Sequence, residues 1–142
     1  MSGGDRINRY GLGMFLLAYQ VLGKFGLNEI PPVTLVALAL QAGMFLKYIS
    51  PHGYGPVIHV CLNGQAILAL GQWHRLFWAH LEHGSDLHLY YNMMSFIWKG
   101  RRLEPFYGSG PFAFLLLTLM GLTGTMYTGL AYFASEVIIK RL

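Results

Sequence analysis

The stretch HLYYNMMSFIWKGRRLEPFYGSG, residues 88–110, places a histidine and an asparagine four positions apart at the start of an apolar segment that runs into a basic cluster. Residues at positions i and i+4 lie on the same face of an α-helix. His88 and Asn92 are therefore expected to stand side by side, where both can donate hydrogen bonds toward one point. A polar pair in a lipid-soluble helix either satisfies neighbouring polar groups or belongs to a functional site.

The composition of the whole chain is that of a membrane protein. Of its 142 residues, 54% are hydrophobic and only 11% are charged, and the mean hydropathy is +0.43, far above what a soluble domain needs. The net charge of +4 comes from Lys and Arg at the ends of apolar runs. Such a distribution lacks a basic stripe, so it favours the lipid bilayer and not nucleic acid as a partner.

Three apolar runs predict an all-α membrane protein with about three transmembrane helices. They are expected over residues 30–49, 87–103 and 110–135. The first run begins with prolines suited to a first helical turn. The third is the clearest, because residues 111–134 carry no charge and would form about 36 Å of helix at ~1.5 Å per residue.

The third run also carries a stripe of small residues. Gly121, Thr125 and Gly129 recur every four positions. Such a stripe lets another helix backbone approach closely, which favours Gly121 and Gly129 as packing positions. Glycine facing lipid is the alternative, since glycine is common in membrane helices.

Residues 1–29 form an N-terminal segment with a short apolar run, 10–26. About 14 residues separate Arg9 from Lys24, fewer than the roughly 20 needed to cross the hydrocarbon core. We therefore expect a helix that lies at, or dips into, the membrane interface. A secretory signal peptide would share this pattern, but no small-x-small cleavage site follows.

The connection between the first two helices, residues 50–86, differs in kind from the apolar runs. Glycines and prolines interrupt it, and all six histidines of the chain fall between His52 and His88. Its apolar pieces are too short to cross a membrane, so it is predicted to be a loop of short helices with membrane affinity. A metal site made by His80, Glu82, His83 and His88 has suggestive spacing but no closed tetrahedral set. No cofactor is expected, and the single Cys61 excludes an internal disulfide or CxxC motif.

The distribution of Lys and Arg predicts the orientation. Six of the ten precede the first helix or connect the second and third helices, whereas Lys47 and Arg75 belong to the opposite side. The positive-inside rule places the six in the cytoplasm and the histidine-rich loop on the lumenal side. Lys140 and Arg141, in the tail 136–142, run against this rule.

Three motifs together resemble the rhomboid family of intramembrane serine proteases. The family's second transmembrane helix carries H-x-x-x-N, matched here by His88 and Asn92. A Trp/Arg element precedes it in the first loop, matched by Trp73 and Arg75 with one residue inserted, and E-x-x-x-G-S follows it, matched from Glu104 onward. The similarity runs from about residue 7 to 135, and in detail it is greatest to a family member of the endoplasmic reticulum.

The resemblance implies a role for each matched residue. His88 and Asn92 would help to build an oxyanion hole, where donors stabilise charge developing on the scissile carbonyl oxygen. Arg75, with Trp73, would stabilise the first loop. Glu104 and Gly108 would form the turn between the second and third helices. His83 would be a further polar residue near the active-site cavity.

The family's catalytic dyad has no counterpart in these 142 residues. Rhomboids take a serine from a G-x-S-G motif on a fourth helix and a histidine from a sixth, whereas the nearest sequence here, Y-G-S-G at 107–110, lacks the first glycine. Residues 30–135 are thus expected to be the N-terminal half of a rhomboid-like bundle, inactive alone. Two functions remain: part of an endopeptidase that cleaves transmembrane proteins, or a noncatalytic adaptor that binds transmembrane clients in endoplasmic-reticulum quality control.

Overall fold

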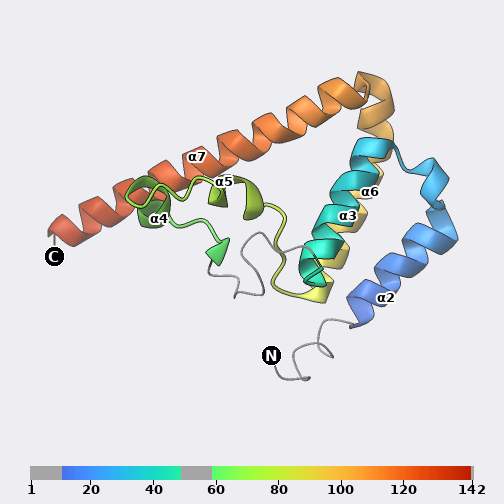
Figure 1. Ribbon diagram of the computed structural model, residues 1–142, viewed down its shortest axis with the longest axis horizontal. Coiled ribbons are helices and arrows are strands. Elements are labelled where there is room, and N and C mark those ends of the chain that lie inside the picture. Colours follow the sequence, from blue (N-terminus) through green and yellow to red (C-terminus); the bar gives the residue numbers. More distant parts are fainter. Residues whose placement is uncertain (1–10, 49–58, 142) are drawn as a thin grey trace. The chain divides into compact units, whose positions relative to one another are not determined.

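The computed structural model describes residues 11–48 and 59–141, the side chains of 139–141 excepted, and every regular element in these ranges is helical (Figure 1). The elements in chain order are α2 (Leu12–Ala18), the π-helix η1 (Tyr19–Phe25), the 3-10 helix η2 (Leu27–Glu29), α3 (Pro32–Phe45), α4 (Gly64–Leu68), α5 (Arg75–Trp78), α6 (Asp86–Tyr107) and α7 (Ser109–Arg141). The all-α class predicted from the apolar runs is confirmed.

The chain divides into two compact units. One consists of Met1–Ser50 with His83–Phe114, and the other of Pro51–Glu82 with Leu115–Leu142. The parts of the predictions that fall on residues 1–10, 49–58 and 142 lie outside the described residues.

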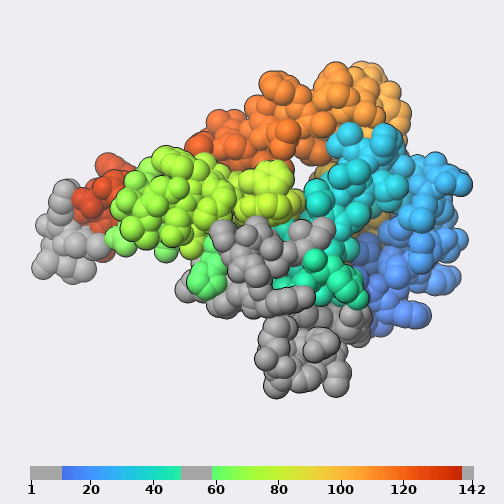
Figure 2. Space-filling model, in the orientation of Figure 1, coloured from blue at the N-terminus to red at the C-terminus, as the bar shows by residue number. Residues whose placement is uncertain are grey.

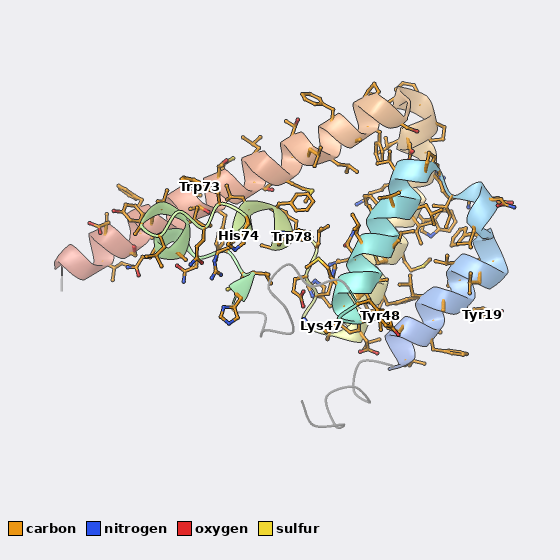
Figure 3. The ribbon with its side chains drawn as sticks, in the orientation of Figure 1. Tyr19, Lys47, Tyr48, Trp73, His74 and Trp78 are labelled. Atoms are coloured by element: carbon orange, nitrogen blue, oxygen red, sulfur yellow. The ribbon has the colours of Figure 1, made fainter. Side chains whose placement is uncertain are left out.

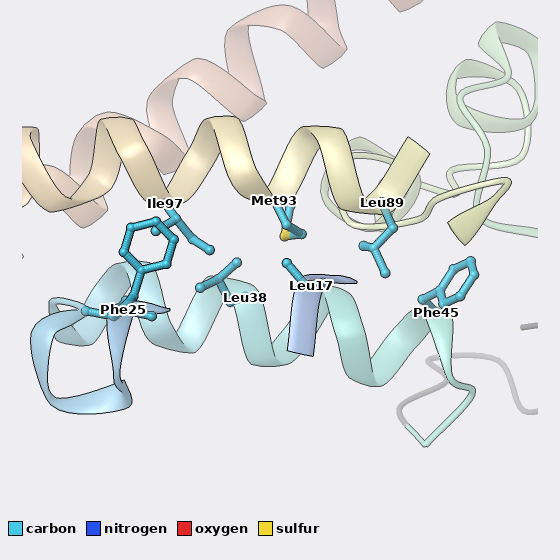
Figure 4. Packing of buried hydrophobic residues seen from close by; sticks show 8 residues of the cluster. Leu17, Phe25, Leu38, Phe45, Leu89, Met93 and Ile97 are labelled. Atoms are coloured by element: carbon cyan, nitrogen blue, oxygen red, sulfur yellow. The ribbon is translucent and has the colours of Figure 1, made fainter. Parts of the chain in front are cut away.

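The core of the first unit lies where α2, η1 and α3 pack on one face of α6. Its buried members are Leu17, Phe25, Ile30, Leu38, Phe45, Leu89, Met93 and Ile97 (Figure 4). The three from α6 recur every fourth residue, as a single helical face requires. Phe45 lies beside Leu89 at one end of this face and Leu38 beside Ile97 further along, so α3 runs antiparallel to α6. Figure 2 shows α2, η1 and α3 forming one continuous surface.

In the second unit, the short helices α4 and α5 pack on the middle of α7. A Cβ placed on Gly124 would lie 3.2 Å from the Leu76 side chain and 3.4 Å from the His80 ring, and one on Gly64 would lie 3.3 Å from the Thr128 carbonyl. The His80 ring also bridges the Leu76 carbonyl, at 2.9 Å, and the Thr123 hydroxyl, at 3.0 Å. The absence of side chains at two glycines therefore allows the loop to approach α7.

The number of membrane spans remains a prediction. By length and composition, one of the described helices can cross a membrane, over Ser109–Ile138. α3 has 14 residues, because Pro31 is extended before it and Lys47 adopts a φ of 64° after it. α6 has 22 residues, but its second half contains Lys99, Arg101, Arg102 and Glu104, which lower its hydropathy.

Candidate functional site

His88 and Asn92 lie on the first two turns of α6, and both side chains are exposed. Each directly precedes a residue of the buried stripe, Leu89 and Met93, so the polar pair points away from that core. Within the described part of the chain neither side chain makes a hydrogen bond. The His88 ring does contact the ring of His83, edge to face, at 5.3 Å between centroids.

The first turn of α6 is fixed from two directions. The Ser85 hydroxyl accepts a hydrogen bond from the His88 backbone N–H at 3.2 Å, as expected of an N-cap residue. Asp86 accepts one from the Gly13 N–H of α2 at 2.9 Å. The imidazole of His83 is buried, 6% exposed, directly behind His88. The backbone that carries the polar pair is thus anchored, even though neither side chain of the pair makes a hydrogen bond within the described residues.

Glu104, near the other end of α6, is a buried side chain with several hydrogen-bond partners. It is 1% exposed and accepts four hydrogen bonds of 2.8 Å each. Their donors are the Val33 N–H, the Thr34 N–H, the Thr34 hydroxyl and the Ser109 hydroxyl. The two N–H groups belong to the first turn of α3, which has no side-chain cap of its own. One carboxylate therefore caps α3 and connects it to the start of α7.

The ionisation of Glu104 follows from these contacts. Burial by itself raises the pKa of this carboxyl, but the hydrogen bonds from Val33, Thr34 and Ser109 favour the charged form more strongly. The resulting pKa lies below the ordinary value of 4.5. Glu104 lies just outside the expected span 87–103, and it is ionised at neutral pH.

Two glycines allow this arrangement. Gly108 ends α6 with a φ of 84°, in the left-handed region that favours glycine. Gly100 is buried against Thr34, and a Cβ there would overlap the Thr34 side chain. Gly100 thus lets α3 come close enough for Thr34 to reach Glu104.

In the second unit, Arg75 is buried and binds its own loop. Its Nη1 donates to the Cys61 carbonyl at 2.9 Å and its Nε to the Gln72 side-chain oxygen at 2.7 Å. The loop is thereby closed over 14 residues. Trp73 is different: its side chain is 57% exposed, and it lies in the turn after Gly71 (Figure 3).

Gly121 and Gly129 have no heavy atom of a non-adjacent residue within 4 Å of a Cβ placed on them, helix backbone aside. Within the described chain the loop approaches α7 closely at Gly124, about one turn along from Gly121, and at the Thr128 carbonyl. Packing at Gly121 and Gly129 remains a prediction.

The alternative of a metal site gains no support from the geometry. Among residues 11–48 and 59–141, no three His, Cys, Asp or Glu side chains are grouped closely enough to hold a metal ion.

Sequence reasoning missed Thr34, Ser109 and Asp86 as partners. One signal was available for Thr34: α3 begins with Pro-Pro-Val-Thr, so its first N–H groups need an acceptor from elsewhere. Ser109 was part of the E-x-x-x-G-S motif but had no assigned role. Nothing local to Asp86 or Gly13 indicates that they meet, because 73 residues separate them.

Comparisons with known proteins agree with the three motifs. A family model described as the Rhomboid domain matches residues 70–139, which include Arg75, the His88–Asn92 pair and Glu104. The chain belongs to the rhomboid family.

Its relatives include longer proteins. The chain is 39% identical to Rhomboid-related protein 4 of Mus musculus over 126 residues, 89% of this chain and 38% of the relative. It is 38% identical to Rhomboid-related protein 4 of Homo sapiens, over 87% of this chain and 38% of the relative. It is also 38% identical to Rhomboid-like protein 14, mitochondrial, of Arabidopsis thaliana, over 81% of this chain and 35% of the relative. The chain thus spans well under half the length of these relatives, and no solved structure matches it.

Proposed function

We propose that this chain is the N-terminal part of a rhomboid-type intramembrane serine endopeptidase in which His88 and Asn92 stabilise the oxyanion. One observation carries the proposal. The two side chains stand on one exposed face of α6 without a hydrogen-bond partner in the described residues, while the helix beneath them is anchored through Ser85 and Asp86. Unpartnered donors on a fixed backbone are preorganised for charge that appears only during a reaction.

The chemistry divides between this chain and residues outside it. Attack on a peptide carbonyl places negative charge on its oxygen, and N–H groups of His88 and Asn92 donate to that oxygen. The attacking serine and the base that takes its proton are assigned to a G-x-S-G motif and a histidine, and the motif does not occur in these 142 residues. The chain by itself is therefore inactive.

The proposal extends to substrates and location. Transmembrane proteins are the proposed substrates, because a site on α6 beside the apolar α3 reaches peptide bonds at membrane depth. We assign the protein to the endoplasmic-reticulum membrane, as a multi-pass protein with the transmembrane helices predicted from the sequence.

The proposal is tested by complementation. The chain is co-expressed with a separate C-terminal rhomboid segment containing G-x-S-G, and cleavage of a transmembrane reporter is measured. Activity should appear, and Asn92→Ala should lower kcat by about 10²-fold, the usual cost of one oxyanion donor. Tyr91→Phe, an exposed neighbour on the same helix, is the control and should leave kcat unchanged.

The opposite result favours the second function. If the two chains associate and the reporter is bound but never cleaved, or if Asn92→Ala and Tyr91→Phe behave alike, the oxyanion role is wrong. Binding without cleavage would support the noncatalytic adaptor.

A further inference from the structure

The N-terminal helical segment α2–η1 follows α6 in register along its length. Gly13 of α2 donates to Asp86, a separation of 73 residues. The Phe25 ring of η1 meets the Trp98 ring edge to face at 5.5 Å, and these positions also differ by 73. A constant offset between contacting residues means that the two segments run parallel.

The two ends of this pairing are held by polar contacts. At the Asp86 end, a Cβ on Gly13 would collide with the backbone of Asp86, so the helices touch directly. At the other end, Arg101 forms an ion pair of 2.7 Å with Glu29 and lies over the Phe25 ring at 5.0 Å from its centroid. The segment therefore runs alongside α6 from Asp86 to Arg101.

The outer face of α2–η1 is as apolar as its inner face. Leu17 and Phe25 are buried against α6, while four residues at helical spacing face away from the unit. They are Leu12, Phe15, Tyr19 and Leu22, between 62% and 68% exposed. Figure 3 labels Tyr19 among them. A helix lying at the interface needs a broad polar face, yet 12–25 contains only Gln20 and Lys24 as strongly polar residues. Gln20 is partly buried.

We propose that α2–η1 is inserted into the bilayer beside α6, with the face formed by Leu12, Phe15, Tyr19 and Leu22 in contact with lipid acyl chains. The N-terminal end of α2 then lies on the same side of the membrane as His88. This differs from the interfacial position expected from the length of the apolar run alone.

The short length of the segment is compatible with insertion. From Leu12 to Phe25 it has 14 residues, the same number as α3, which is about 21 Å long at ~1.5 Å per residue. Short segments are accommodated by thinning of the bilayer and by snorkelling of flanking residues, and Lys24 is exposed at the Arg101 end for this purpose. Because α3 is equally short, it requires the same thinning of the bilayer as α2–η1.

Insertion changes the charge count used for orientation. Arg6 and Arg9 then count on the side of the histidine-rich loop. Four Lys and Arg residues remain on the opposite side, namely Lys24, Lys99, Arg101 and Arg102, against six on the side of the loop. The positive-inside count then ceases to favour a cytoplasmic α6–α7 turn.

Depth measurements test the lipid contact. In a Cys61→Ser background, single cysteines replace Leu12, Phe15, Tyr19 or Leu22, and each is spin-labelled in liposomes. The ratio of relaxation by oxygen to that by an aqueous nickel chelate should be greatest at positions 15 and 19 and smaller at both ends. Equal depth at all four positions would mean a helix lying along the interface and would overturn the proposal.

Sidedness is tested independently. Gly84→Cys and Gly110→Cys serve as references for the two ends of α6, because a Cβ at either position meets nothing within 4 Å. In sealed microsomes, an impermeant maleimide reaches cysteines on one side of the membrane only. It should either label both Ser2→Cys and Gly84→Cys or neither of them, and Gly110→Cys should give the opposite result. Labelling of Ser2→Cys together with Gly110→Cys would refute insertion of α2–η1 as a crossing segment.

Discussion

At the scale of single residues, Glu104 joins α6 to α3 and to the start of α7. Glu104→Gln leaves a group with one acceptor oxygen facing four donors, so at least one buried N–H or O–H loses its partner. We expect a loss of about 2–4 kcal/mol in stability, since bonds to a charged group contribute about 1.5–3 kcal/mol and orphaned donors cost more. Thermal unfolding in detergent measures this.

Glu29→Gln is the matched control, because Glu29 makes an exposed ion pair whose contribution is about 0–1 kcal/mol.

The effect of Glu104→Gln also depends on pH. The pKa of Glu104 is lowered in the folded state, so its contribution is complete above the ordinary value of 4.5 and disappears as the pH falls through the lower folded pKa. The difference in stability between the unsubstituted chain and Glu104→Gln should therefore shrink as the pH falls through the folded pKa of Glu104. A difference that stays constant with pH would mean that the charge of Glu104 is not the cause.

Gly100 provides a second prediction at this scale. Gly100→Ala improves helix propensity by about 1 kcal/mol but places a methyl group inside the Thr34 side chain. Because α3 must move away from Glu104 to make room, we expect a net loss of about 1–3 kcal/mol. Gly110→Ala, whose Cβ meets no neighbour, should be neutral or stabilising in the same unfolding assay. Equal behaviour of the two variants would show that Gly100 is not a contact position.

The sequence predicted some of this network and not the rest. Glu104 and Gly108 were assigned to a turn through the resemblance to the family motif. Their partners in α3 were not predicted, because the pairing joins residues 70 and 71 positions apart, and such a register is decided by packing of the whole helix. The exposed pair His88 and Asn92 was placed on one helix face from spacing alone.

At the scale of elements, the predicted packing positions of α7 differ from the position that the loop contacts. Two of its small residues, Gly121 and Gly129, were predicted to pack, yet the loop contacts Gly124. A periodic stripe identifies a smooth face but does not identify what covers it. The structure has helices over Asp86–Tyr107 and Ser109–Arg141, where the sequence predicted membrane spans over 87–103 and 110–135. The switch of α2 into a π-helix has no sequence signal that we recognise.

Substitutions at Gly124 and at Gly121 test which of these two positions of α7 contacts the loop. Gly124→Leu should displace Leu76 and His80 from α7, because the present contacts leave no room for a larger side chain. Gly121→Leu should leave this packing intact in the isolated chain. Limited proteolysis of the loop near Arg75 is the measurement, with faster cleavage expected for Gly124→Leu alone. Equal cleavage rates would place the loop contact elsewhere.

At the scale of the whole molecule, composition predicted the membrane class and the motifs predicted the rhomboid family. Neither predicted that α2–η1 pairs with α6 over its full length, because its 14 residues fall below the usual length for a span. The length criterion treats each helix alone, whereas here packing against α6 and the polar contacts of Asp86 and Arg101 fix the position of the segment along α6. Tertiary packing therefore sets where the segment lies along α6, which the length and composition of the apolar run do not determine.

The absence of G-x-S-G gives the last prediction, which concerns activity. An oxyanion hole lowers a barrier only after a nucleophile attacks, so His88 and Asn92 cannot catalyse hydrolysis by themselves. Of the chain's serines, Ser109 comes nearest to the motif, but its hydroxyl donates to Glu104 at 2.8 Å and supports the α6–α7 turn. Reconstituted in liposomes, the 142-residue chain should neither cleave a transmembrane reporter nor react with a fluorophosphonate probe. Labelling that disappears when a single serine is changed to alanine would show that another nucleophile is present and that the division of the site proposed above is wrong.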